Sequence, residues 1–121
     1  MKYEIEGLHH VQLAAPKGTE EEIRAFYGGL LGLREVAKPA TLQKNGGVWF
    51  ECGTHRLHIG VEAEFRPAKK GHPAIQVRGL RAFRTALEER GVTTVDAEPI
   101  PGADRFYIAD PFGNRIELIE W

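Results

Sequence analysis

The stretch Asp110-Pro111-Phe112-Gly113-Asn114-Arg115-Ile116-Glu117-Leu118 joins a turn to the beginning of a strand. Its first five residues include proline, glycine, aspartate and asparagine, which favour tight turns. The residues after the turn, 115–121, predict a strand, and 105–109 predict the strand before it. Because successive side chains of a strand face opposite sides, Glu117 is predicted to point away from Ile116 and Leu118.

The second half of the chain, from His72 onward, predicts one module made of a strand, a helix and three further strands. Residues 72–77 predict the first strand, and 92–95 predict a short strand before the final pair. Between them, apolar residues recur at helical spacing, and Gly91 supplies a natural end to the helix. The helical set consists of Leu80, Phe83, Ala86, Leu87 and Arg90.

The first half of the chain predicts the same order of elements. Strands are expected at 10–15, 34–37, 47–52 and 56–62, and the helix between the first two carries Ile23, Phe26, Tyr27, Leu30 and Leu31. Thr19-Glu20-Glu21-Glu22 has the form of a capping box at the beginning of this helix. We therefore predict a single domain, 1–121, with module one at about 8–62, a linker at 63–71 and module two at about 72–121. The repeat rests on the order of elements, since no identical residues recur.

The composition limits the classes of function. The chain has 121 residues and a formal net charge of −1, which predicts one domain without long-range attraction to nucleic acid or an anionic membrane. The single cysteine, Cys52, excludes an internal disulfide and agrees with a reducing compartment. The apolar stretches fall short of the ~18 residues that span a bilayer. We expect a cytoplasmic protein that binds neither nucleic acid nor membranes.

Four polar residues occupy repeated positions in the two halves. His10 and His72 lie in the first predicted strand of a half, whereas His58 and Glu117 lie in the last. Alternation places all four on the face opposite the apolar residues that pack under the helices. Such polar groups are costly to bury unless they share partners, and a shared metal ion would satisfy them. An ordinary hydrogen-bonded residue of the core or the surface is the alternative, and it is the interpretation we favour for His9 and His55, which occupy no repeated position.

These residues also carry a family resemblance. The chain resembles the vicinal oxygen chelate superfamily, which includes glyoxalase I, extradiol dioxygenases, and fosfomycin- and bleomycin-resistance proteins. The resemblance spans nearly the whole chain, and the final stretch is its most specific part. It rests on four motifs in order: 10–13 (HVQL), 26–33 (FYGGLLGL), 71–74 (GHPA) and 110–118 (DPFGNRIEL). It implies an α+β fold of two βαβββ modules that form a cupped mixed sheet with the helices outside.

The resemblance also implies one divalent metal per chain. His10, His72 and Glu117 fall on metal-ligand positions, and His58 falls where glyoxalase I has a glutamate. That departure leaves Glu117 as the one carboxylate at these positions, and hence the candidate catalytic residue. Two histidines and one carboxylate form a facial triad that suits iron(II), although zinc, nickel and manganese also accept these donors. His58 would be a fourth ligand, a neighbour that orients a ligand, or a substrate contact.

The expected function is that of a metal-dependent enzyme, a lyase, isomerase or dioxygenase, acting on a small molecule with vicinal oxygens. Thiol transfer to fosfomycin is a further alternative, and a metal-free protein that sequesters a drug or metabolite, as in bleomycin resistance, belongs to another class. Phe50 and Tyr107 are candidate substrate contacts, although aromatic residues at such positions often belong to the core. The superfamily commonly covers its exposed strand edges by pairing, so we expect a homodimer.

Overall fold

The computed structural model describes residues 2–121, which form two compact units. Unit 1 comprises Met1–Phe65 and unit 2 comprises Arg66–Trp121. The boundary lies inside the segment 63–71 that the sequence predicts as a linker. No helix among residues 2–121 has both the length and the apolar character needed to cross a membrane.

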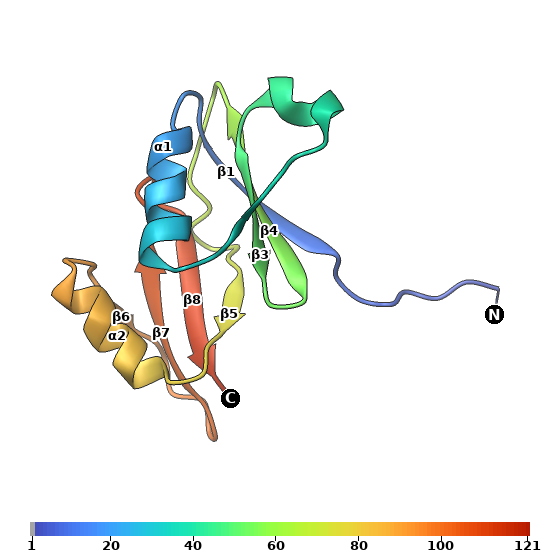
Figure 1. Cartoon of the computed structure of the whole chain (residues 1–121). Coiled ribbons are helices and arrows are strands. Elements are labelled where there is room, and N and C mark those ends of the chain that lie inside the picture. The colour runs from blue at the N-terminus through green and yellow to red at the C-terminus, as the bar shows by residue number, and fades with distance from the viewer. Residues whose placement is uncertain (1) are drawn as a thin grey trace. The chain divides into compact units, whose positions relative to one another are not determined.

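Unit 1 contains a four-stranded mixed sheet with the order β1-β4-β3-β2 (Figure 1). Strand β1 runs parallel to β4, whereas β3 is antiparallel to both β4 and β2. The strands span His10–Pro16 (β1), Glu35–Val36 (β2), Val48–Cys52 (β3) and His55–Glu62 (β4). Cys52 pairs with His55, so Gly53 and Thr54 form the predicted two-residue hairpin loop.

The helix of unit 1 begins as the α-helix α1, Glu20–Ile23, and continues as a π-helical segment, η1, Arg24–Leu30. Its buried residues include Ile23, Phe26 and Tyr27, three members of the predicted apolar face. A 3₁₀ helix, η2, Ala40–Asn45, precedes β3. The sequence analysis did not predict η2.

The predicted capping box is wrong, because the side chain of Thr19 bonds a carbonyl outside the helix instead of a helical N–H. Thr19 makes no side-chain cap, and its hydroxyl donates instead to the carbonyl of Pro16 at 2.6 Å. The carboxylate of Glu20 accepts the backbone N–H of Gly47 at 2.8 Å, which ties the helix to the beginning of β3. This contact lowers the pKa of Glu20, because the hydrogen bond from Gly47 favours the charged carboxylate.

Unit 2 repeats this topology with the strand order β5-β8-β7-β6. Its elements span Ala74–Gln76 (β5), Leu80–Glu89 (α2), Val95–Asp96 (β6), Asp104–Ala109 (β7) and Arg115–Glu120 (β8). Strand β5 is parallel to β8, and the other pairs are antiparallel. Two βαβββ modules of an α+β, glyoxalase-like fold are therefore confirmed.

Each unit has its own apolar core on one face of its sheet. In unit 2, Leu80 and Leu87 of α2 are buried together with Ile116 and Leu118 of β8. In unit 1, Leu57 and Ile59 of β4 are buried in the same alternating pattern. Because strand residues alternate between faces, the polar residues between these apolar ones lie on the opposite face of each sheet.

Candidate functional site

In each unit, the strand that comes last in the sequence, β4 or β8, carries one candidate site residue opposite an aromatic residue. His58 on β4 pairs with Trp49 on β3, and Glu117 on β8 pairs with Tyr107 on β7. The strand register thus gives the two halves the same arrangement, even though their residues differ. Trp49 is the structural counterpart of Tyr107.

The candidate histidines also occupy matching positions. His58 lies opposite Gln12 on β1, two residues after His10. Glu117 lies opposite Ala74 on β5, two residues after His72. The repeated positions predicted from the sequence are therefore also repeated in the register of the sheets. His72 itself lies just before β5, which begins two residues later than predicted.

In unit 1, His58 lies in a stack of three rings. Its ring centroid is 3.8 Å from that of Trp49, with the rings parallel at 0°, and 4.2 Å from that of His10, at 22°. His58 is only 4% exposed, and its Nε2 has no hydrogen-bond partner among residues 2–121. A buried imidazole nitrogen without a partner carries an unmet desolvation cost.

The surroundings of His58 lower its pKa to about 4. Burial is the largest cause, because desolvation penalises the charged ring, and the nearby positive charges of His10 and Arg56 act in the same direction. At neutral pH the ring is therefore uncharged. A neutral imidazole is the form that binds a metal.

A cavity of about 540 Å³ opens beside this stack, and its lining includes His10, His58, Trp49 and Arg56. His9 and His55 also line it, and both are exposed, as is His10. His9 contacts His10 through the two Nδ1 atoms at 3.0 Å, and His55 contacts only the hydroxyl of Thr54, at 3.3 Å, among the hydrogen bonds found in the described chain. Neither His9 nor His55 stacks on the ring of His58.

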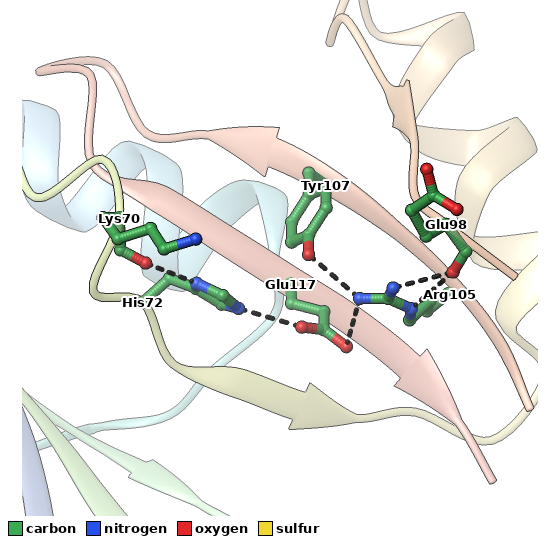
Figure 2. Close-up of polar contacts among 6 residues, drawn as sticks. All are labelled: Lys70, His72, Glu98, Arg105, Tyr107 and Glu117. Carbon is green, nitrogen blue, oxygen red and sulfur yellow. Dashed lines mark hydrogen bonds and ion pairs between the residues drawn. The ribbon is translucent and has the colours of Figure 1, made fainter. Parts of the chain in front are cut away.

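In unit 2, His72 joins Glu117 to the backbone (Figure 2). Its Nε2 lies 2.9 Å from Oε1 of Glu117, and its Nδ1 lies 3.0 Å from the carbonyl oxygen of Lys70. A carbonyl accepts but cannot donate, so Nδ1 must carry the hydrogen. The contact between Nε2 and Oε1 then needs one further proton, held by the imidazole or by the carboxyl group.

Arg105 completes this network on β7. Its Nη1 lies 3.5 Å from Oε2 of Glu117 and donates to the hydroxyl of Tyr107 at 2.9 Å. Its Nε and Nη2 donate to the carbonyl of Glu98 at 3.1 and 2.7 Å. The sequence analysis missed Arg105, although its position two residues before Tyr107 in a strand places both on one face.

The two predicted aromatic contacts lie in different environments. Tyr107 packs edge-on against His72, with ring centroids 5.4 Å apart, on the face that carries Glu117. Phe50 is fully buried and lies 5.9 Å from the ring of Tyr27, in the core of unit 1. Because Phe50 follows Trp49 in β3, its side chain faces away from His58.

The predicted metal ligands come as two pairs, one in each unit. Unit 1 brings His10 to His58, and unit 2 brings His72 to Glu117. Among residues 2–121, no group of three histidine, cysteine, aspartate or glutamate side chains forms a metal-binding cluster.

The comparisons with known proteins support the fold and the family. A solved glyoxalase family protein from Bacillus anthracis is 50% identical, covering 99% of this chain and 98% of its own, with a TM-score of 0.96. Two more distant structures share the fold. They are lactoylglutathione lyase from Agrobacterium tumefaciens (22% identity, 96% and 94% coverage, TM-score 0.76) and fosfomycin resistance protein FosX from Mesorhizobium loti (18%, 98% and 94%, 0.71).

No curated protein matches the chain in sequence. The model of one family matches residues 7–118, which is nearly the whole chain, including both modules and all four candidate ligands. The chain belongs to the Glyoxalase/Bleomycin resistance protein/Dioxygenase superfamily.

Proposed function

We propose that this chain is a metal-dependent enzyme that acts on a small molecule with two adjacent oxygens. His10, His72 and Glu117 would hold one divalent ion, with His58 as a fourth ligand or as a support for the others. Imidazole and carboxylate donors suit zinc, nickel, iron(II) and manganese. Membership of the superfamily supports the class of function, and the two pairs of donors support the ligand set.

One observation carries the proposal, namely the orientation of His72. Histidines that bind metals almost always donate their other ring N–H to a carbonyl or carboxylate, which fixes the tautomer. His72 does this through Nδ1 and the carbonyl of Lys70, which aims Nε2 at the carboxylate of Glu117. His72 and Glu117 would thus be the two residues of unit 2 that hold a divalent ion.

The pair in unit 1, His10 and His58, also suits a divalent metal ion. His58 is buried and uncharged at neutral pH, and its Nε2 has no hydrogen-bond partner in the described chain. A metal ligand must be an unprotonated nitrogen, so this ring is already in the required state. His10 stacks directly on it. The donors of unit 1 therefore suit the one proposed ion as well as the donors of unit 2 do.

A bound ion would act as a Lewis acid that polarises the substrate oxygens. We assign Glu117 as the catalytic residue, because it is the one carboxylate among the four candidates. It would accept a proton from a substrate carbon next to a carbonyl and return it to the neighbouring carbon. Arg105 lies next to Oε2 of Glu117 and would hold the carboxylate in place during this transfer. Tyr107, whose hydroxyl accepts a hydrogen bond from Arg105, would contact the substrate.

Calorimetry on chelator-treated protein tests the proposal. We expect uptake of about one divalent ion per chain. His10→Ala, His72→Ala and Glu117→Ala should each weaken binding by at least a hundredfold, since loss of even a supporting group costs roughly 10- to 100-fold. His55→Ala is the matched control and should bind normally, because His55 contacts none of the four candidate ligands in the described chain. No uptake of zinc, nickel, iron(II) or manganese would overturn the proposal.

A metal-free binding protein is the second candidate, and the ion pair between Arg105 and Glu117 favours it. This guanidinium already neutralises the carboxylate without a metal. Assays with methylglyoxal–thiol adducts, catechols, and fosfomycin with a thiol would separate lyase, dioxygenase and transferase activity. Tight binding of a drug such as bleomycin by chelated protein, with no turnover of any of these, would favour the second candidate.

We also propose a homodimer in the cytoplasm. Several large apolar side chains are exposed on the single chain, among them Tyr3, Ile5 and Leu8 in unit 1 and Trp121 in unit 2. Exposed apolar surface favours association. Light scattering at micromolar concentration should give twice the mass of one chain, and a monomer would contradict this part of the proposal.

A further inference from the structure

A second cavity lies within unit 2, and Tyr107, which packs against His72, is one of its lining residues. It has a volume of about 300 Å³, and its lining includes Lys69, Thr93, Tyr107 and Arg115. Two of these residues are cationic, and the lining contains no acidic side chain. Among residues 2–121, neither Lys69 nor Arg115 has an ion pair with a carboxylate. The cavity therefore presents two positive charges without a matching negative charge.

Arg115 is fixed in this cavity by its strand and by an aromatic ring. It lies on β8 two residues before Glu117, on the same face, so the two Cα atoms are about 7 Å apart. Its guanidinium carbon lies 4.3 Å from the ring centroid of Tyr107, in a cation–π contact. This contact holds the planar guanidinium, whose N–H groups have no hydrogen-bond partner among residues 2–121 and can therefore meet a ligand.

The turn before β8 anchors the backbone next to Lys69, whose side chain is exposed. The side chain of Asn114 is buried. Its Oδ1 accepts a hydrogen bond from the backbone N–H of Ala68 at 2.9 Å, and its Nδ2 donates to the carboxylate of Asp110 at 2.8 Å. The backbone N–H of Arg115 donates to the carbonyl of Ala68 at 2.8 Å. Ala68 is thus hydrogen-bonded on both sides, which fixes the backbone next to Lys69.

We propose that this cavity binds an oxyanion group, a carboxylate or a phosphate, at one end of the substrate. Guanidinium groups bind such oxyanions through paired, charge-assisted hydrogen bonds, and the ammonium of Lys69 adds a point charge. The proposal rests on the proposed function for the other end of the substrate, whose adjacent oxygens would lie near Glu117. It narrows the substrate class to small anionic molecules, with Tyr107 in contact with both His72 and Arg115.

Nuclear magnetic resonance on chelated, isotope-labelled protein tests the site without a metal. The probes are inorganic phosphate, malonate and the uncharged analogue malonamide. We expect saturable shifts around Lys69, Tyr107 and Arg115 with one or both anions and none with malonamide, and weaker binding at high salt. The tighter of the two anions identifies the group as phosphate or carboxylate.

Arg115→Gln should weaken anion binding by about tenfold, as expected for loss of charged hydrogen bonds, and Lys69→Gln by less. Arg115→Lys retains the charge without the paired donors, so it should bind at an intermediate level. Arg81→Gln, an exposed change of the same charge in α2, is the control and should bind normally. Shifts that do not saturate, or that persist unchanged in Arg115→Gln and Lys69→Gln, would overturn the proposal. Anion binding without metal uptake would overturn only the metal proposal.

Discussion

The two units place different chemistry at the same positions. In unit 1, a neutral histidine is held by ring stacking between Trp49 and His10. In unit 2, the matching position holds Glu117, whose two oxygens face His72 and Arg105. One half of the candidate site is thus maintained by aromatic packing and the other by charge. An internal repeat preserves the backbone frame without preserving the interactions within it.

One position in each unit explains this contrast. It lies two residues before the aromatic partner, and it is Gly47 in unit 1 and Arg105 in unit 2. Gly47 has a φ of +82°, and a Cβ there would lie 2.3 Å from the carbonyl oxygen of Ile59. The unit 1 position therefore cannot accept a side chain, whereas in unit 2 Arg105 extends from it to support the carboxylate.

The largest effect on stability should follow from placing a side chain at Gly47. Gly47→Ala combines a positive φ with a collision against backbone, so we expect a loss of about 3 kcal/mol or more in the free energy of unfolding. Gly53→Ala is the matched control, since its φ is +61° but no atom lies within 4 Å of the added Cβ. That change should cost only about 1 kcal/mol from backbone strain. Equal losses in urea denaturation of the two variants would contradict the collision.

The second effect is a dependence of stability on pH that comes from unit 1. The pKa of His58 falls from 6.5 to about 4 on folding, so the unfolded chain binds a proton that the folded chain rejects. The stabilising contribution is complete above pH 6.5 and is lost as the pH falls toward 4, up to about 3 kcal/mol. Chemical denaturation in chelator at several pH values measures this. His58→Phe should flatten the curve in this window, and an unchanged slope would contradict the assignment.

Much of the fold could be predicted because the alternation of apolar and polar residues is strong. The order of elements, the hairpin at Gly53 and the repeated positions of His58 and Glu117 all follow from local patterns that the register confirms. The capping box failed because the hydroxyl of Thr19 donates to the carbonyl of Pro16 instead of capping the helix, and the neighbouring Glu20 binds Gly47, a residue distant in sequence. Local patterns do not show which distant backbone group a side chain will meet.

The candidate site was harder to predict than the fold. Arg105 was missed because its role depends on pairing between β7 and β8, which brings it to Glu117. Between Trp49 and Phe50, the sequence offered two neighbouring aromatic residues on opposite faces, and only the register shows that Trp49 is the one opposite His58. The metal-ligand set and its catalytic role remain predictions until metal uptake is measured.

The third effect is a loss of charge balance in unit 2. Glu117→Gln removes the negative charge that faces Arg105 and His72, which are largely buried on this side of the sheet. We expect a loss of about 2 kcal/mol in the free energy of unfolding of the metal-free protein, because a buried cation loses its partner. Glu89→Gln, an exposed change at the end of α2, is the control and should have little effect. A loss no greater than that of the control would show that the charge network is not stabilising.

The smallest effect should have the opposite sign and lies in unit 1. His58→Phe keeps an aromatic ring between Trp49 and His10 but removes the buried Nε2, which has no hydrogen-bond partner among the described residues. Removing an unsatisfied polar group while keeping its shape is neutral or stabilising, so we expect a gain of up to about 1 kcal/mol in chelator at neutral pH. His55→Phe, on the exposed hairpin, should change stability by less than about 0.5 kcal/mol. The same His58→Phe protein should bind metal more weakly, because it lacks the imidazole that we propose serves the metal site despite its cost to stability. A loss of stability on this change would mean that the nitrogen has a structural partner, and the contrast between a stacked and a charged half-site would then fail.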